Sequence, residues 1–267
     1  MQNGWSGAVT MADFDIVSYL MGKATGSGGG VTILSGNTEP SAGQGNNGQI
    51  YLRYLPNEYV PVEYIQSDGS QYIDTQYIPT VHTAAELKLN AQNIQESAIL
   101  GSGWQINGFF LMFYGGRFRW HSGTSADSYL ISLNTDYTVR INNTSMLVNG
   151  VASVVSPGTP ADAAIRIFST TIPGDAGASN TKGSYKLYYL NIIEDNVLVR
   201  HMIPVKRTSD NTPGLYDTIN GAFYVNGGTG DFAIGQVQNS SVVTAAYAKV
   251  NGIWQDLIGT SIADITI

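Results

Sequence analysis

Short segments of alternating apolar and polar residues, separated by pairs of turn residues, run along most of the chain. The dipeptide Asn-Gly occurs seven times, and several copies stand between such segments. Both central residues of a type I′ turn have positive φ, which Asn and Gly tolerate, so these pairs predict β-hairpins. The clearest hairpin is MLVNGVASVV, residues 146–155, and the pairs Asn107-Gly108, Asn220-Gly221 and Asn251-Gly252 predict further turns. The pattern therefore predicts an all-β protein.

One segment near the N-terminus has helical periodicity instead. Its apolar side chains fall on one helix face: Phe14, Val17, Leu20 and Met21. Asp13 can cap the start of this helix and Gly22 can end it. A helix this short is marginal alone and needs a partner surface, and the GSGGG that follows has the composition of a flexible tether. We expect residues 1–30 to anchor the protein to a neighbouring subunit, with a frayed terminus as the alternative.

Four predicted strands flank a long central region. They cover residues 31–34, 49–54, 242–250 and 253–258. We expect them to form one small β module, residues 31–55 plus 237–267, with residues 56–236 inserted as a separate domain. Insertions are tolerated at hairpin tips when the inserted domain has its ends close together.

The central region begins and ends with two distinctive blocks. The opening block, PNEYVPVEYIQSDGSQYIDTQYIPT, predicts a strand, a polar turn at 67–69 and a second strand, 71–78, that Pro79 ends. The closing block, KLYYLNIIEDNVLVRHMIPVKRTSDNTPGLYDTINGAFYVNGGTGDF, predicts two adjoining strands and a hairpin that begins with Gly-Leu-Tyr-Asp. Together they resemble concanavalin A-like, LamG-type jelly-roll domains of bacteriophage virion proteins such as head fibres, decoration proteins and tail fibres. The resemblance implies a jelly-roll sandwich over residues 56–236.

Composition excludes several classes of partner. The net charge is -7, and the 13 Lys and Arg residues are scattered, so we expect no nucleic-acid binding. The chain has no cysteine, which excludes disulfides and thiolate metal sites. The longest purely apolar run, residues 109–114, is far too short to span a bilayer, and no membrane role is expected.

Patterns typical of enzymes are missing or lie in the wrong context. GQGNNG at residues 43–48 matches GxGxxG, but it leads into a predicted strand and not a helix, which favours a turn. The ExDxxE pattern of the glycanase relatives is absent, and Glu194 and Asp195 are consecutive, so a pair of catalytic carboxylates is not indicated. Since the three histidines also lack metal-ligand spacing, we assign no catalytic residue.

Calcium is a candidate cofactor. The resemblance to LamG-type domains implies that a rim loop can hold calcium through Asp side chains and backbone carbonyls. The available residues are Asp74 in the opening block and Asp217 and Asp231 in the closing block. No DxDxDG run accompanies them, so capping of turns is the default interpretation.

The segment WQINGFFLMFYGGRFRWH, residues 104–121, holds the best candidates for glycan binding. Glycan sites usually combine an aromatic ring with polar groups, and this segment supplies Trp104, Tyr114, Arg117, Arg119 and His121. Strand alternation puts the last three on one face, opposite Phe118 and Trp120. We expect Phe118 and Trp120 to face the core, and the two arginines to contact a polar or acidic glycan.

The resemblance and these residues lead to one expected function. We expect a non-enzymatic virion protein, assembled in the cytoplasm of the host bacterium, whose lectin-like domain adheres to host or mucosal glycans. It would contact other virion subunits through its N-terminal segment and form a homo-oligomer, with a trimer as one form. A purely structural role in bracing the particle is the first alternative, and a tail polysaccharide hydrolase is the second. Head and tail locations both stay open.

Overall fold

The computed structural model describes residues 33–103, 108–170, 182–238 and 242–256. The predicted anchor helix, with Phe14, Val17, Leu20 and Met21, lies outside these residues. The chain divides into two compact units, Glu58–Asn239 and a smaller unit made of Met1–Asn57 with Ser240–Ile267. Within the described residues every regular element is a β-strand, and no helix has the length and hydropathy to cross a membrane.

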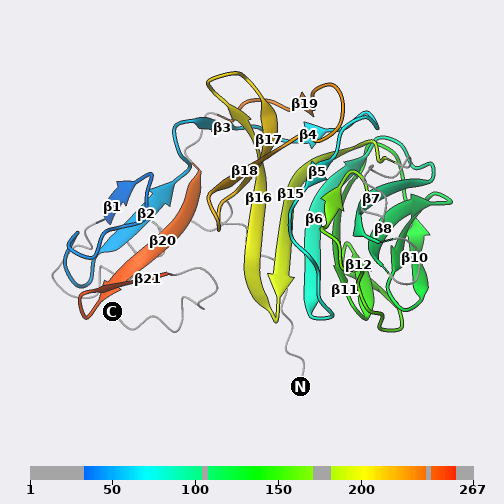
Figure 1. Ribbon diagram of the computed structural model, residues 1–267, viewed down its shortest axis with the longest axis horizontal. Coiled ribbons are helices and arrows are strands. Elements are labelled where there is room, and N and C mark those ends of the chain that lie inside the picture. Colours follow the sequence, from blue (N-terminus) through cyan, green and yellow to red (C-terminus); the bar gives the residue numbers. More distant parts are fainter. Residues whose placement is uncertain (1–32, 104–107, 171–181, 239–241, 257–267) are drawn as a thin grey trace. The chain divides into compact units, whose positions relative to one another are not determined.

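The larger unit consists of two antiparallel sheets (Figure 1). The six-stranded sheet has the order β10 (Ser125–Leu130), β9 (Arg117–His121), β8 (Phe109–Tyr114), β7 (Ser97–Ser102), β14 (Arg166–Ile167), β5 (Ile73–Asp74). The eleven-stranded sheet follows the path β13 (Val151–Val154), β12 (Ser145–Val148), β11 (Asp136–Asn142), β6 (Thr83–Ala91), β15 (Tyr185–Glu194), β16 (Val197–Arg207), β17 (Pro213–Asp217), β18 (Ala222–Val225). Three further strands of this sheet lie off that path: β3 (Tyr59–Pro61), β4 (Ile65–Gln66) and β19 (Ala233–Ile234).

One hydrophobic core lies between the two sheets. It combines Leu87 and Leu190 of the larger sheet with Leu111 and Phe113 of the smaller one, all of them fully buried. The ring of Phe113 meets the edge of Tyr185 across this interface at 6.2 Å between centroids. Burial of a large apolar side chain contributes about 1.5–3 kcal/mol, so the facing surfaces hold the sheets together. The predicted fold class, an all-β jelly-roll sandwich inserted in a small β module, is confirmed.

Two of the four Asn-Gly pairs for which hairpin turns are predicted form them. Asn149 and Gly150 have φ of 47° and 82° and join β12 to β13, as the type I′ prediction requires. Asn220-Gly221 differs, because only Gly221 has positive φ and the pair ends a four-residue loop, 218–221, between β17 and β18. Asn107 lies outside the described residues. A turn that the Asn-Gly pattern misses is Asp195-Asn196, with φ of 49° and 66°, between β15 and β16.

The second strand predicted in the opening block is wrong in length. The prediction covers residues 71–78, but β5 spans only Ile73–Asp74. Gln76 has φ of 56°, and its N–H donates to Oδ1 of Asp74 at 2.9 Å. The hydroxyl of Thr75 donates to the carbonyl of Ile165 at 2.7 Å. These side-chain bonds compete with the sheet ladder, so the regular strand ends at Asp74. Backbone hydrogen bonds of Thr75 and Tyr77 with Ile165 still keep the chain beside the segment that precedes β14.

The smaller unit is a four-stranded mixed sheet. Its order is β1 (Ile33–Gly36), β2 (Ile50–Tyr54), β20 (Val243–Val250), β21 (Ile253–Asp256). β1 and β2 are parallel, whereas β2 pairs antiparallel with β20, which lies nearly 200 residues further along the chain. Asn251 and Gly252, with φ of 51° and 79°, form the predicted turn between β20 and β21.

Lys249 holds the loop that precedes β2 in place through three hydrogen bonds. The side chain is 5% exposed, and its Nζ donates to the carbonyls of Ala42, Gln44 and Gly45 at 2.8, 2.6 and 3.0 Å. This loop contains the GxGxxG match and continues into β2. The turn interpretation is therefore confirmed, since a dinucleotide site needs the glycines to open a helix.

Candidate functional site

The candidate residues of β9 lie on the outer face of the six-stranded sheet. Burial alternates along the strand: Phe118 and Trp120 are fully buried in the core, whereas Arg117, Arg119 and His121 are partly exposed. The orientation predicted from alternation is confirmed. Trp120 also donates its indole N–H to the carbonyl of Asn142 in β11 at 3.0 Å, which satisfies its polar atom inside the core.

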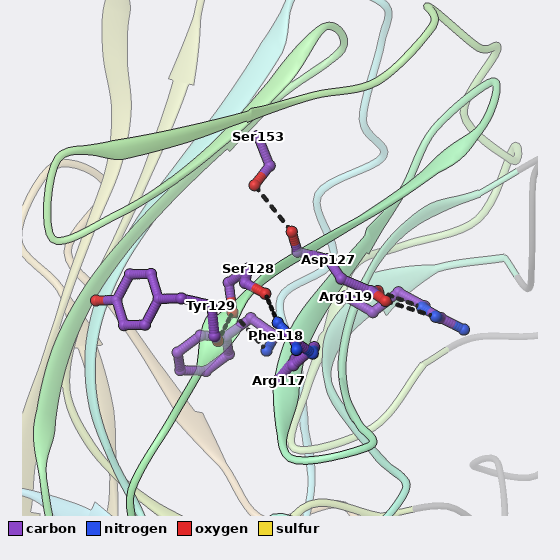
Figure 2. A network of polar contacts seen from close by, with 7 residues as sticks. All are labelled: Arg117, Phe118, Arg119, Asp127, Ser128, Tyr129 and Ser153. Atoms are coloured by element: carbon purple, nitrogen blue, oxygen red, sulfur yellow. Dashed lines mark hydrogen bonds and ion pairs between the residues drawn. The ribbon is translucent and has the colours of Figure 1, made fainter.

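Arg119 is fixed between an aromatic ring and a carboxylate. Its guanidinium carbon lies 3.6 Å from the centroid of the Tyr114 ring. Asp127, opposite Arg119 in β10, accepts from its Nε and Nη2 at 2.5 and 2.7 Å (Figure 2). This hydrogen bond raises the pKa of Arg119 and lowers that of Asp127. Such bidentate pairing fixes the orientation of the guanidinium as well as its charge.

Arg117 contacts the backbone of the same neighbouring strand. Its Nη1 donates to the carbonyl of Ser128 at 2.7 Å, and the Ser128 hydroxyl accepts the N–H of Phe118 at 3.0 Å. The register of β9 and β10 shifts between Asp127 and Leu130. Figure 2 shows Arg117 bonded to Ser128 and Arg119 bonded to Asp127. The irregularity thus lies where Arg117 contacts β10, whereas Arg119 and Asp127 pair in regular register.

His121 completes the face with an uncharged ring. The ring stacks on Phe110 of β8, with centroids 5.7 Å apart and planes 20° apart. Burial lowers the pKa of His121, and the positive charge of Arg119 lowers it further. The buried Nδ1 has no hydrogen-bond partner in the described part of the chain, so a proton there would be unpaired. The neutral ring protonated at Nε2 is therefore favoured.

Together these residues form a surface that we name the β9 face: Tyr114, Arg117, Arg119, His121 and Asp127. Tyr114 is 38% exposed, so an aromatic ring stands beside four polar groups. Trp104, the remaining predicted member, lies outside the described residues. Sequence reasoning misses Asp127, although a hairpin centred on residues 122–124 would have placed it opposite Arg119.

The three calcium candidates lie apart and have structural partners. Asp217 is fully buried and accepts from the N–H groups of His201 and Ile219 at 3.1 and 3.0 Å. Asp74 pairs with Arg166 at 3.4 Å. Asp231 is exposed, and its carbonyl accepts from the side chain of Gln71. Across the described ranges no three His, Cys, Asp or Glu side chains are grouped to hold a metal ion, so the calcium prediction gains no support.

Glu194, a carboxylate considered for hydrolysis, caps a loop. Tyr77, Thr80 and Thr83 all donate to its oxygens. Burial by itself would raise the pKa of Glu194, but these hydrogen bonds outweigh it and the pKa is lowered. A general acid of a glycosidase needs the opposite shift.

Comparison with solved structures gives distant similarities. No family model and no curated protein matches the chain. A "putative carbohydrate binding protein" from Bacteroides ovatus ATCC 8483 has 10% sequence identity and a TM-score of 0.46 over 74% of this chain and 72% of that chain. The native heptameric SAP-like pentraxin of Limulus polyphemus has 11% identity and a TM-score of 0.36 over 53% of this chain and 76% of its own. Similarities this low carry no functional argument, so the fold assignment rests on the sheets themselves.

Proposed function

We propose that this protein is a lectin-like adhesin that binds polar or acidic glycans through the β9 face, without catalysing a reaction. The observation that carries the proposal is the fixed pair of arginines beside an exposed tyrosine. A guanidinium has five N–H donors. Arg119 uses two of them on Asp127, and Arg117 uses one on Ser128. Donors that stay unused within the described residues can bind carboxylate, sulfate or hydroxyl groups of a glycan.

The fixed geometry favours binding. A flexible arginine loses rotamer freedom when it binds a ligand, at a cost of about 0.5–1.5 kcal/mol for each immobilised side chain. Asp127 and the Tyr114 ring already hold Arg119, so less of that freedom is lost. The β9 face has two guanidinium charges against one carboxylate, which favours an acidic glycan over a neutral one.

The binding test compares chondroitin sulfate with neutral dextran, using calorimetry on the intact chain. We expect binding of chondroitin sulfate only, and at least a tenfold loss of affinity in Arg117→Ala and in Arg119→Ala. Arg207→Ala is a matched control, because Arg207 makes a similar bidentate pair with exposed Asp210 outside this face. Equal affinity of the wild-type and Arg117→Ala/Arg119→Ala proteins would overturn the proposal, as would absence of binding.

We further propose that a bacteriophage particle displays this domain. The resemblance of the opening and closing blocks supports this location, together with assembly in the host cytoplasm, attachment through residues 1–30 and homo-oligomerisation. Gold labelling of virions with an antibody against residues 57–235 tests it. Label at the tail tip supports host attachment, label on the head supports a decoration or head-fibre role, and unlabelled virions contradict the proposal.

A bracing role is the second candidate, and exposed apolar side chains favour it. Leu130 of β10 and Val151 and Val154 of β13 are 66%, 57% and 77% exposed. β10 and β13 are edge strands of the two sheets, and their exposed apolar side chains can pack against neighbouring subunits. Bracing predicts that Leu130→Asp and Val154→Asp impair particle assembly while Arg117→Ala and Arg119→Ala do not.

A further inference from the structure

The outer face of the eleven-stranded sheet carries polar residues that are nearly inaccessible. Leu87, Val139 and Leu190 point into the core, so their neighbours in sequence point outward. Among these neighbours, Glu86 is 6% exposed and Asn191 is 7% exposed. Polar side chains are seldom this buried, because their burial costs free energy unless they are hydrogen-bonded.

Four of these outward residues stand in one line across four strands. Strand register places Arg140 of β11 opposite Glu86 of β6, Glu86 opposite Asn191 of β15, and Asn191 opposite His201 of β16. We name this line the polar row. It extends over three strand spacings, about 14 Å. Arg140 Nη1 lies 3.6 Å from Glu86 Oε2, and His201 Nδ1 lies 2.7 Å from Asn191 Oδ1.

The Asn191–His201 pair leaves complementary groups for a ligand. Burial lowers the pKa of His201, so its ring is neutral near pH 7. Its Nδ1 is then the donor to Asn191 Oδ1, which leaves Nε2 as an acceptor. In the part of the chain that the structure describes, the Asn191 amide N–H groups have no acceptor. An amide donor beside an imidazole acceptor matches one hydroxyl group, which both accepts and donates.

A second line of polar groups borders the row on β6, β11 and β15. Lys88 Nζ lies 3.3 Å from Asp136 Oδ2 and 4.8 Å from the centroid of the Tyr188 ring. The Tyr188 hydroxyl donates to Asp136 Oδ1 at 3.2 Å. The side chains of Lys88 and Asp136 are 40% and 45% exposed, so this border is open to solvent. Tyr188 also meets the ring of Tyr64 edge-on at 5.8 Å.

Charge balance distinguishes this surface from the β9 face. The cations of the polar row and its border are each paired with a carboxylate: Arg140 with Glu86, and Lys88 with Asp136. Cross-strand ion pairs stabilise a sheet without any ligand, but that role does not require a nearly buried Asn191 with unused donors. We propose that the polar row and its border form a second binding site, which takes an extended segment of a neutral glycan through its hydroxyl groups.

The test uses soluble neutral hexasaccharides of the β-glucan, mannan and xylan types, with amide NMR titration of the intact chain. We expect at least one to shift the amide signals of β6, β15 and β16, and not those of β9. Asn191→Asp keeps the side-chain shape but removes the amide donors. We expect the dissociation constant of this variant to be about ten times larger than that of the wild-type protein. Asn93→Asp is the matched control, because exposed Asn93 uses only its side-chain oxygen, to cap Gln95.

Tyr188→Phe provides a second variant on the border, in case Asn191→Asp does not fold. It removes one hydroxyl and is expected to weaken binding about threefold. The proposal is overturned if no hexasaccharide shifts the signals of β6, β15 and β16, or if all folded variants bind as the wild-type protein does. Arg117→Ala and Arg119→Ala are expected to leave this binding unchanged. Failure of the β9-face proposal is therefore distinguishable from failure here.

Discussion

The hydroxyl of Ser153 in β13 donates a hydrogen bond of 2.9 Å to the backbone carbonyl of Asp127 in β10 (Figure 2). β13 and β10 are the edge strands of the two sheets, so this bond joins the sheets at one end of the sandwich. The carboxylate of Asp127 meanwhile holds Arg119. Asp127 therefore connects the β9 face to both sheets.

We expect Asp127→Asn to destabilise the protein only above acidic pH. The pKa of Asp127 is lowered in the folded state by the hydrogen bond from Arg119. A lowered carboxyl pKa contributes stability that is complete above the unfolded value of about 4 and is lost as pH falls through the folded value. Since the pair is partly exposed, the contribution is about 0.5–1 kcal/mol.

Urea denaturation of both proteins at pH 7 and pH 2 checks this expectation. The wild-type protein is expected to be more stable than Asp127→Asn at pH 7, with the difference shrinking at pH 2. A difference that is the same at both pH values would show that the ion pair is not its source.

We expect Trp120→Phe to destabilise the larger unit by about 2 kcal/mol. The substitution removes buried ring volume from the core and leaves the carbonyl of Asn142 without its donor. Chemical denaturation followed by tyrosine fluorescence or circular dichroism measures the change. Tyr129→Phe, at a partly exposed position, is the control and should be close to neutral. A neutral Trp120→Phe would mean that the core tolerates the loss by repacking.

We expect Gly150→Ala to cost about 1 kcal/mol although nothing obstructs the added methyl group. A Cβ at Gly150 meets no atom within 4 Å, so the cost comes from its φ of 82° alone. Gly115 also has open space and positive φ, 56°, between β8 and β9, and Gly115→Ala should behave alike. Gly43 has open space without positive φ, so Gly43→Ala should be neutral. Thermal denaturation compares all three, and equal melting temperatures would contradict the conformational argument.

We expect Lys249→Met to release the loop before β2. Three backbone carbonyls would lose their donor, at a cost of about 1–3 kcal/mol. The amide of Gly48 donates to the Lys249 carbonyl, so its hydrogen exchange reports on the same loop. We expect faster exchange at Gly48 with unchanged exchange in β6 of the larger unit. Unchanged exchange at Gly48 would show that the lysine does not hold the loop.

Local patterns along the chain are enough to predict the hairpins and the orientation of β9. The turn at Asn149-Gly150 depends on two adjacent residues, and the burial of Phe118 and Trp120 follows from strict alternation. Both features arise from the geometry of neighbouring residues, which sequence contains directly. The shortened β5 is the exception, because side-chain bonds at Asp74 and Thr75 override alternation.

The partners of the candidate sites depend on strand register, which local sequence does not contain. Asp127 lies opposite Arg119 because β10 pairs with β9 in one particular register. The polar row joins Glu86 to Asn191, which follows it by more than 100 residues, and to Arg140 of a third strand. A shift of one residue in any strand would turn these side chains to the opposite face. Only the packed core selects the register, so the tertiary structure alone brings these groups together.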